Sequence, residues 1–256
     1  MNNAIIKEIR TFVSKYQSNT ELTAKWLTPL VGFASASDPL FHELKKAVSP
    51  THALPGDLLQ GAETVIVYFL PYDHFVAKSN KDGRMASREW ALSYIDTNKL
   101  IVAINTHLAG ILKHYGAETA LLPPTHNFSP EKLISDWSHR HIAYIAGLGK
   151  FGLHNLLITE NGCSGRLGSV VTTALLEPTR RPEGEYCLEK AGKTCKVCVK
   201  KCVGQALTDS GFNRFKCWDI LLENDALHSE GDTDVCGKCC SITPCSFGIP
   251  IKSATA

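Results

Sequence analysis

The sequence predicts a mixed α/β (α+β) fold, with an N-terminal α/β domain over residues 1–178 and a small cysteine-rich domain over residues 179–256. Two observations predict the first domain: apolar residues recur at helical spacing in several stretches, and β-branched and aromatic residues form short runs that end at proline or glycine. The third observation is that every cysteine except Cys163 follows residue 186.

The composition is that of a compact protein with a substantial core. The 256 residues are 44% hydrophobic and 20% charged. No apolar run approaches the roughly 20 residues of a membrane span, and a net charge of +2 gives no general nucleic-acid signal. Met1 leads into a charged amphipathic stretch without an apolar signal region, so we expect a location in the reducing cytoplasm.

Helical periodicity and breakers predict five helices. The longest covers residues 87–115 and ends at Gly116, as expected of a C-terminal glycine. The others are expected at residues 5–16, 21–27 and 39–46 and from residue 131 onward. Within the longest helix, the residues around His107 come close to the D-x-H-x-x-G pattern of cobalt-binding histidines but lack its aspartate. We interpret His107 as an ordinary helix histidine.

Strands are predicted at residues 64–71, 117–122, 157–159 and 168–176. The first ends at Pro71, with Tyr68 and Tyr72 near its exit. Ligand crevices form at strand ends in open α/β sheets, so we expect Tyr68 to be part of a cofactor wall.

Eight cysteines form two matched groups. Each group combines a C-x-x-C pair with an upstream cysteine and a displaced downstream one; the groups are Cys187, Cys195, Cys198 and Cys202, then Cys217, Cys236, Cys239 and Cys245. Thiolates are the ligands of iron–sulfur clusters, and in two-cluster ferredoxins the last cysteine of each run binds the other cluster. This rule assigns Cys187, Cys195, Cys198 and Cys245 to one [4Fe-4S] cluster, and Cys202, Cys217, Cys236 and Cys239 to a second. Cys163 and Cys240 are left unassigned.

Two other interpretations of the cysteines stay open. Two structural zinc ions would also use four thiolates each, although zinc ribbons usually show two C-x-x-C pairs per ion. Disulfides would require an exported protein. Five lysines accompany the first group, with Glu189 as the one acid among them: Lys190, Lys193, Lys196, Lys200 and Lys201. This patch would suit an acidic electron donor of the ferredoxin or flavodoxin type, or it is a solvated face.

A second informative stretch is poor in side-chain bulk. Ala143, Ala146, Gly147, Gly149 and Gly152 leave the backbone open to close approach by something wide. The alternative is a helix C-cap followed by a hairpin, in which glycine merely satisfies turn geometry.

Together, the bulk-poor stretch and the eight cysteines resemble the epoxyqueuosine reductase family and, more distantly, the reductive dehalogenases. Besides the cysteines, the matching positions are Arg140, Ala143, residues 146–149, Gly152, residues 157–158, Gly162 and residues 55–68. The resemblance covers roughly residues 50 to 250.

The resemblance implies a corrinoid-dependent reductase that acts on a small molecule. Base-off cobalamin would lie between a cobalamin-binding-type α/β domain and a ferredoxin-like domain, with electrons passing through the two clusters to cobalt. Gly147, Gly149, Phe151 and Gly152 would line the corrin, and Arg140 would hold the loop or a cofactor side chain. The absence of a usable D-x-H-x-x-G motif agrees with base-off binding.

The sequence departs from the family in two ways. Leu133 stands where epoxyqueuosine reductases carry an aspartate proton donor, so Asp136 and His139, with His141 nearby, become the candidate acids; Asp136 could equally be a helix cap or an ion-pair partner. The chain ends soon after Cys245 without the helical repeats that grip tRNA in many of those enzymes, so we do not expect action on tRNA. The alternative function is an electron-transfer or binding protein that retains the clusters without corrinoid catalysis.

Overall fold

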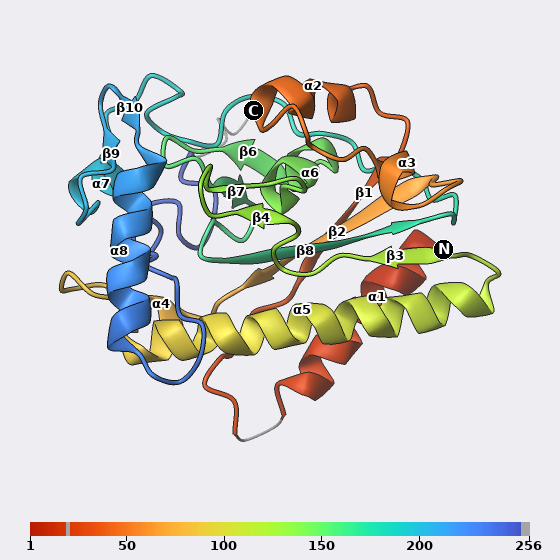
Figure 1. The fold of residues 1–256 in the computed structure, drawn as a ribbon, viewed down its shortest axis with the longest axis horizontal. Coiled ribbons are helices and arrows are strands. Elements are labelled where there is room, and N and C mark those ends of the chain that lie inside the picture. The colour runs from red at the N-terminus through yellow and green to blue at the C-terminus, as the bar shows by residue number, and fades with distance from the viewer. Residues whose placement is uncertain (19–20, 252–256) are drawn as a thin grey trace.

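The computed structural model describes residues 1–18 and 21–251. Its centre is a four-stranded sheet in the order β1-β2-β8-β3, and all three pairings are antiparallel (Figure 1). The strands are β1 (Leu30–Ser35), β2 (Thr64–Pro71), β3 (Thr119–Leu121) and β8 (Gly165–Thr172). The fold is therefore a mixture of helices and antiparallel strands.

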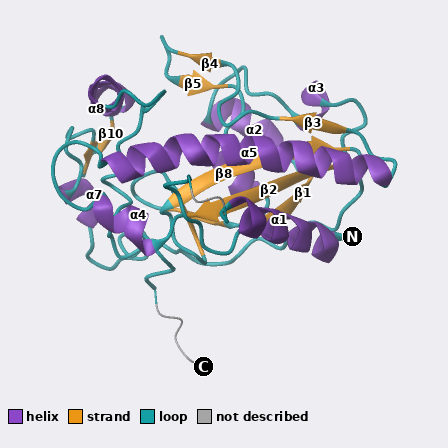
Figure 2. Cartoon of the chain, turned by 90° about the horizontal axis from the view of Figure 1, so that it is seen from below, coloured by secondary structure: helices purple, strands orange, loops and turns teal. Residues whose placement is uncertain are grey.

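Helices cover both faces of the sheet. On one face lie α1 (Asn2–Tyr16) and α5 (Arg88–His114), which are both visible in Figure 2, and on the other lie α2 (Leu40–Ala47) and α6 (His139–Ile145). Every residue of β2 is buried: Ile66, Tyr68 and Leu70 belong to the hydrophobic cluster of α1 and α5, whereas Val65, Val67 and Phe69 belong to that of α2 and α6. This double burial explains why the strand is an unbroken apolar run.

The C-terminal segment, residues 179–251, packs against one end of this sheet. Beyond β8 the described elements are short, apart from one helix: α7 (Val197–Lys200), β9 (Leu207–Thr208), β10 (Gly211–Phe212) and α8 (Arg214–Leu227). They lie beside α4 (His74–Ser79) and the start of α5 (Figure 1). Lys238 is buried here and donates to the carbonyls of Asn80 (3.2 Å) and Asp82 (2.7 Å). One hydrophobic cluster includes Trp90 of α5 as well as Cys187 and Cys240, so the core continues across the predicted boundary at residue 178.

Most predicted elements are confirmed, and two predicted helices are wrong. Residues 21–27 are extended, because the Asp96 carboxylate accepts the backbone N–H groups of Thr23 and Ala24 in place of helical carbonyls. The helix expected from residue 131 is a hairpin of β4 (Phe128–Ser129) and β5 (Ile134–Ser135). The structure also contains a short helix ahead of β2, α3 (Pro55–Leu58). Within the described ranges, no helix has the length and apolarity to cross a membrane.

The bulk-poor stretch begins in α6 and contributes one strand of a second hairpin, in which β6 (Gly149–Phe151) pairs with β7 (Leu157–Thr159). A Cβ on Gly149 would lie 2.0 Å from the Ile158 carbonyl oxygen, so the hairpin requires glycine there. Gly147 has a φ of +74°, which ends α6 in the left-handed conformation. The glycines thus allow close approach of the protein's own backbone.

Candidate functional site

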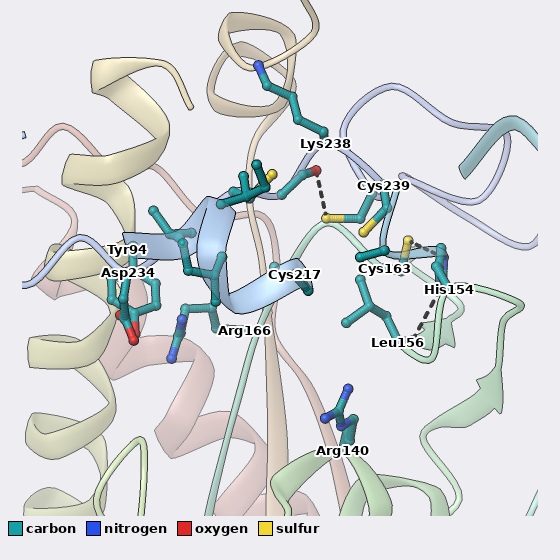
Figure 3. Close-up of a pocket in the computed structure, with 18 of the residues that line it drawn as sticks. Tyr94, Arg140, His154, Leu156, Cys163, Arg166, Cys217, Asp234, Lys238 and Cys239 are labelled. Carbon is teal, nitrogen blue, oxygen red and sulfur yellow. Dashed lines mark hydrogen bonds between the residues drawn. The ribbon is translucent and has the colours of Figure 1, made fainter. Parts of the chain in front are cut away.

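Two cavities lie at the end of the sheet where the C-terminal segment packs. The larger, of about 520 Å³, is lined from the start of α5, the starts of β8 and α6, and the C-terminal segment (Figure 3). We call it the large cavity. The second, which we call the small cavity, is lined by residues 153–154, 187–189, 195–198, 243–245 and 250.

The eight cysteines divide between these cavities. Cys187, Cys195, Cys198 and Cys245 line the small cavity and are absent from the walls of the large one. Cys202, Cys217, Cys236 and Cys239 line the large cavity, together with Cys163 and Cys240. Each of the two sets of four that the crossing rule assigns therefore lines one cavity, and their role as cluster ligands stays a prediction.

Burial perturbs several of these thiols. It raises the pKa of Cys198 and Cys217 to about 12 and that of Cys236 to about 11, and neighbouring thiols add to the effect. The neighbours of Cys198 include Cys239 of the other set, so the two sets adjoin. Thiols crowded together away from water are poor hydrogen-bonding groups, but as thiolates they are strong ligands for soft metals.

Of the residues predicted to bind the corrinoid, Arg140 lines the large cavity. Its Nη1 donates to the Asn155 carbonyl at 3.0 Å. Gly147, Gly149, Gly152 and Phe151 are absent from that lining.

The other predicted contacts are also accounted for by packing. A Cβ on Gly152 would lie 2.6 Å from the His154 ring, and Phe151 packs on the rings of His141 and Tyr144. The structure places Tyr68 in the core rather than in a cofactor wall, because the sheet face that it occupies is covered by α5. Its hydroxyl donates to Asn105 Oδ1 at 2.7 Å.

The two predicted acids occupy different surroundings. Asp136 lies in the β4–β5 region, with Oδ1 2.6 Å from His126 Nδ1 and Oδ2 accepting from Asn127, and it does not line the large cavity. His139 does line it, but is buried, and burial lowers its pKa to about 4. His139 is therefore neutral at pH 7. Burial also lowers the pKa of His141 to about 4.

Three polar residues that belong to no sequence motif meet at the large cavity. The Tyr94 hydroxyl donates to Asp234 Oδ1 at 2.6 Å, and the Arg166 guanidinium lies 4.0 Å from the centre of the Tyr94 ring. Among the described residues, Arg166 Nε is buried without a hydrogen-bond partner. Burial raises the pKa of Asp234 and of Tyr94. No spacing pattern in the sequence connects these residues, because the fold alone brings them together.

Figure 3 shows this group on one side of the large cavity and Cys163, His154 and Cys239 on the other. A neighbouring groove of about 590 Å³ shares Tyr94 and Asp234 with the cavity and extends over Trp218 and Leu222 of α8. A ligand larger than the cavity itself would therefore have room to extend into the groove.

His154, Cys163 and Cys245 form a compact cluster at the wall between the two cavities. Their ligand atoms all lie within 4.8 Å of one another. Cys163 and Cys245 come from far apart in the chain. The first lies just before β8, separated from it by Ser164, and the second lies in the C-terminal segment.

Comparison with known proteins shows a shared fold. No protein-family model matches the chain, and no curated protein matches it. Epoxyqueuosine reductase from Streptococcus thermophilus aligns with 93% of this chain and 68% of its own, with a TM-score of 0.57 and 16% identity. An epoxyqueuosine reductase solved with an epoxyqueuosine-modified tRNA-Tyr stem loop aligns with 96% of this chain and 68% of its own, with a TM-score of 0.59 and 17% identity.

A catabolic reductive dehalogenase has the same core. It aligns with 87% of this chain and 30% of its own, with a TM-score of 0.54 and 14% identity. The two groups of structural neighbours are the two families that the sequence resembles, which confirms the resemblance at the level of the fold.

Proposed function

We propose that this protein is a cobalamin-dependent iron–sulfur reductase in which two [4Fe-4S] clusters supply electrons. The observation that carries the proposal is the division of eight cysteines, four to each cavity, in the crossed sets expected of a two-cluster protein. A zinc-ribbon arrangement gives no reason for this crossing, because each ion would take its ligands from neighbouring C-x-x-C pairs.

Each donor set offers four thiols, the number of ligands that a [4Fe-4S] cluster takes. Cys187, Cys195, Cys198 and Cys245 would hold one cluster in the small cavity, and Cys202, Cys217, Cys236 and Cys239 would hold the other at the edge of the large cavity. Since the sets adjoin at Cys198 and Cys239, electrons would pass from one to the other over a short path. Arg140, whose charge acts on Cys217 and Cys239, would favour the reduced form of the second cluster.

The large cavity, with its adjoining groove, offers a corrinoid a place beside the second cysteine set. When bound, the corrinoid would supply the reductive chemistry, and the protein would supply binding, orientation and protons. We propose Asp234 and Tyr94 as the groups that hold the proton, since they share a 2.6 Å hydrogen bond at the cavity wall. Of the acids predicted from sequence, Asp136 does not line the cavity, and His139 is a neutral imidazole at pH 7, without the acidic imidazolium proton.

The electron donor would bind near the lysines of the first cysteine group. Three of the five lysines have structural partners: Lys190 donates to the Phe151 carbonyl, Lys196 pairs with Asp209 at 3.1 Å, and Lys201 donates to the Ser241 carbonyl. The patch is thus partly structural, and Lys193 and Lys200 are the residues through which we propose that an acidic donor docks.

A second candidate function is an electron-transfer protein that holds the clusters without a corrinoid. Two observations favour it: Leu133 replaces the family's acid, and the residues predicted to line the corrin pack against the protein's own chain. One structural neighbour was solved with a tRNA stem loop, but we do not propose action on tRNA for this chain.

Anaerobic reconstitution with iron, sulfide and cobalamin, followed by metal analysis and visible spectroscopy, tests the proposal. About eight irons and one cobalt per chain are expected for the reductase. Iron without cobalt would favour the electron-transfer protein, and two zinc ions in a colourless preparation would overturn both. Matched variants test the ligand sets: Cys245→Ala should damage the cluster of Cys187, whereas Cys236→Ala should damage the other.

A further inference from the structure

We propose that His154 and Cys163 set the reduction potential of the cluster in the small cavity, by donating hydrogen bonds to the sulfur of Cys245. The inference rests on the proposed function, since it requires that Cys245 bind a cluster. Neither His154 nor Cys163 is one of the eight cluster ligands.

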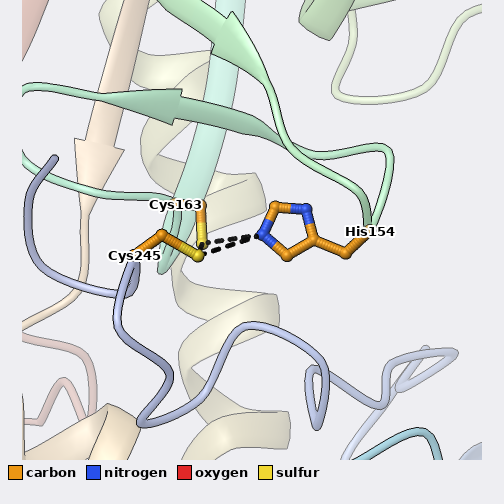
Figure 4. A group of neighbouring side chains, drawn as sticks. All are labelled: His154, Cys163 and Cys245. Atoms are coloured by element: carbon orange, nitrogen blue, oxygen red, sulfur yellow. Dashed lines mark hydrogen bonds between the residues drawn. The ribbon is translucent and has the colours of Figure 1, made fainter. Parts of the chain in front are cut away.

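The three side chains converge closely (Figure 4). Cys163 Sγ donates to Cys245 Sγ at 3.8 Å, and His154 Nε2 lies 3.4 Å from each sulfur. Backbone hydrogen bonds fix this arrangement: the N–H of Cys163 donates to the Cys245 carbonyl at 2.9 Å, and that of Ser164 donates to the Ser246 carbonyl at 3.1 Å. These two backbone hydrogen bonds therefore hold Cys163 and Cys245 next to each other.

The opposite edge of the His154 ring shows which nitrogen carries the proton. The backbone N–H of Leu156 donates to Nδ1 at 3.1 Å, so Nδ1 is an acceptor. In a neutral imidazole the proton then lies on Nε2, which faces the sulfurs as a donor.

This tautomer also excludes the simplest alternative, a mononuclear metal bound by the three residues. A neutral histidine that binds a metal through Nε2 carries its proton on Nδ1 and donates it to a neighbouring acceptor. Here Nδ1 faces an N–H donor instead. The cluster of side chains is therefore a donor set around one sulfur.

His154 and Cys163 lie between the two cavities, where they can influence electron transfer from one cluster to the other. His154 lines both cavities, Cys163 lines the large one and Cys245 lines the small one. Cys163 is 4% exposed, so little water competes for these hydrogen bonds. Hydrogen bonds to a cluster sulfur stabilise the more negative, reduced cluster and so raise its reduction potential.

Redox titration of the reconstituted protein, followed by electron paramagnetic resonance, tests the inference. In Cys163→Ala and in His154→Leu, the midpoint potential of the cluster that Cys245 binds should fall, while that of the second cluster stays unchanged. Cys163→Ser keeps a donor and should restore the wild-type midpoint in large part. The matched control for the cluster that Cys245 binds is Cys240→Ala, which should leave the midpoint of that cluster unchanged. The Cys240 thiol is also buried, but it lies beside the second cysteine set and donates to the Gly237 carbonyl at 3.2 Å.

Iron analysis separates the possible failures. Loss of about four irons in Cys163→Ala would make Cys163 a ligand and overturn the inference. Full iron content with unchanged midpoints in both variants would overturn it as well. A wild-type protein that binds no cluster would refute the proposed function itself.

Discussion

The imidazole of His139 should remain neutral down to about pH 4. The ring lies between Ser169 Oγ at Nδ1 and the Pro123 carbonyl at Nε2, each 3.0 Å away. A carbonyl accepts only, so Nε2 carries the single proton and Nδ1 accepts from the serine hydroxyl. Protonation would bury a second charge near Arg166, and burial, the larger effect, lowers the pKa to about 4.

The magnitude follows from this pKa. A histidine pKa of 6.5 in the unfolded chain against about 4 in the fold corresponds to about 3 kcal/mol of unfolding free energy. Because the unfolded chain takes up the proton first, this contribution is complete above pH 6.5 and is lost as the pH falls towards 4. At pH 5, about 2 kcal/mol of it is gone.

Nuclear magnetic resonance of histidine-labelled protein measures the pKa directly, and His139→Gln identifies the resonance. The loss of stability between pH 7 and pH 5 should be smaller in His139→Gln than in wild type, by about 2 kcal/mol. His42→Gln, which removes an exposed histidine, should retain the wild-type dependence. A His139 titration midpoint at or above pH 6 would refute the reasoning and restore His139 as a candidate acid.

Three further predictions concern packing and metal content. Gly149→Ala should destabilise the fold by about 1–3 kcal/mol, because its Cβ would meet the Ile158 carbonyl. Gly56→Ala should not destabilise the fold, because the space around its Cβ is open. Thermal unfolding compares the two variants, and equal melting temperatures would contradict the hairpin geometry. Trp137→Phe should cost about 1–2 kcal/mol in chemical denaturation, since it removes the buried 3.0 Å hydrogen bond to Ser169; no measurable loss would mean that water replaces the indole. After a chelator removes the iron, limited proteolysis should cleave residues 187–245 earlier than it cleaves the sheet, because that segment has few regular elements of its own. A first cleavage within β2 would contradict this prediction.

The parts of the fold that were predictable from sequence are those where local pattern and tertiary packing agree. Helix α5 has a serine N-cap, periodic apolar residues and a terminal glycine, and β2 is a β-branched run that ends at proline. The helix expected at 21–27 was wrong because a distant carboxylate, Asp96, satisfies its backbone. No local signal reports such a long-range partner.

The same distinction applies to the candidate site. The division of the eight cysteines between the two cavities follows from local ligand spacing and the general crossing rule, whereas their role as cluster ligands stays a prediction. Tyr94, Arg166 and Asp234 could not, because they become neighbours only when the C-terminal segment packs against α5 and β8. The bulk-poor stretch indicated that another group approaches its backbone closely, but it did not identify that group. In the structure the backbone of β7 approaches Gly149.

The backbone hydrogen bonds between residues 163–164 and 245–246 affect whether the C-terminal segment can be moved as an independent module. The sequence predicts a separate ferredoxin-like domain for the C-terminal segment, yet the last cysteine of that segment takes its neighbours from the residues that enter β8. Transplanting residues 179–251 onto another scaffold would leave Cys163 and His154 behind, and a one-residue insertion before β8 would shift Cys163 out of register with Cys245. These two hydrogen bonds therefore tie the position of Cys245 to the residues that enter β8, so a redesign of either segment has to preserve their pairing.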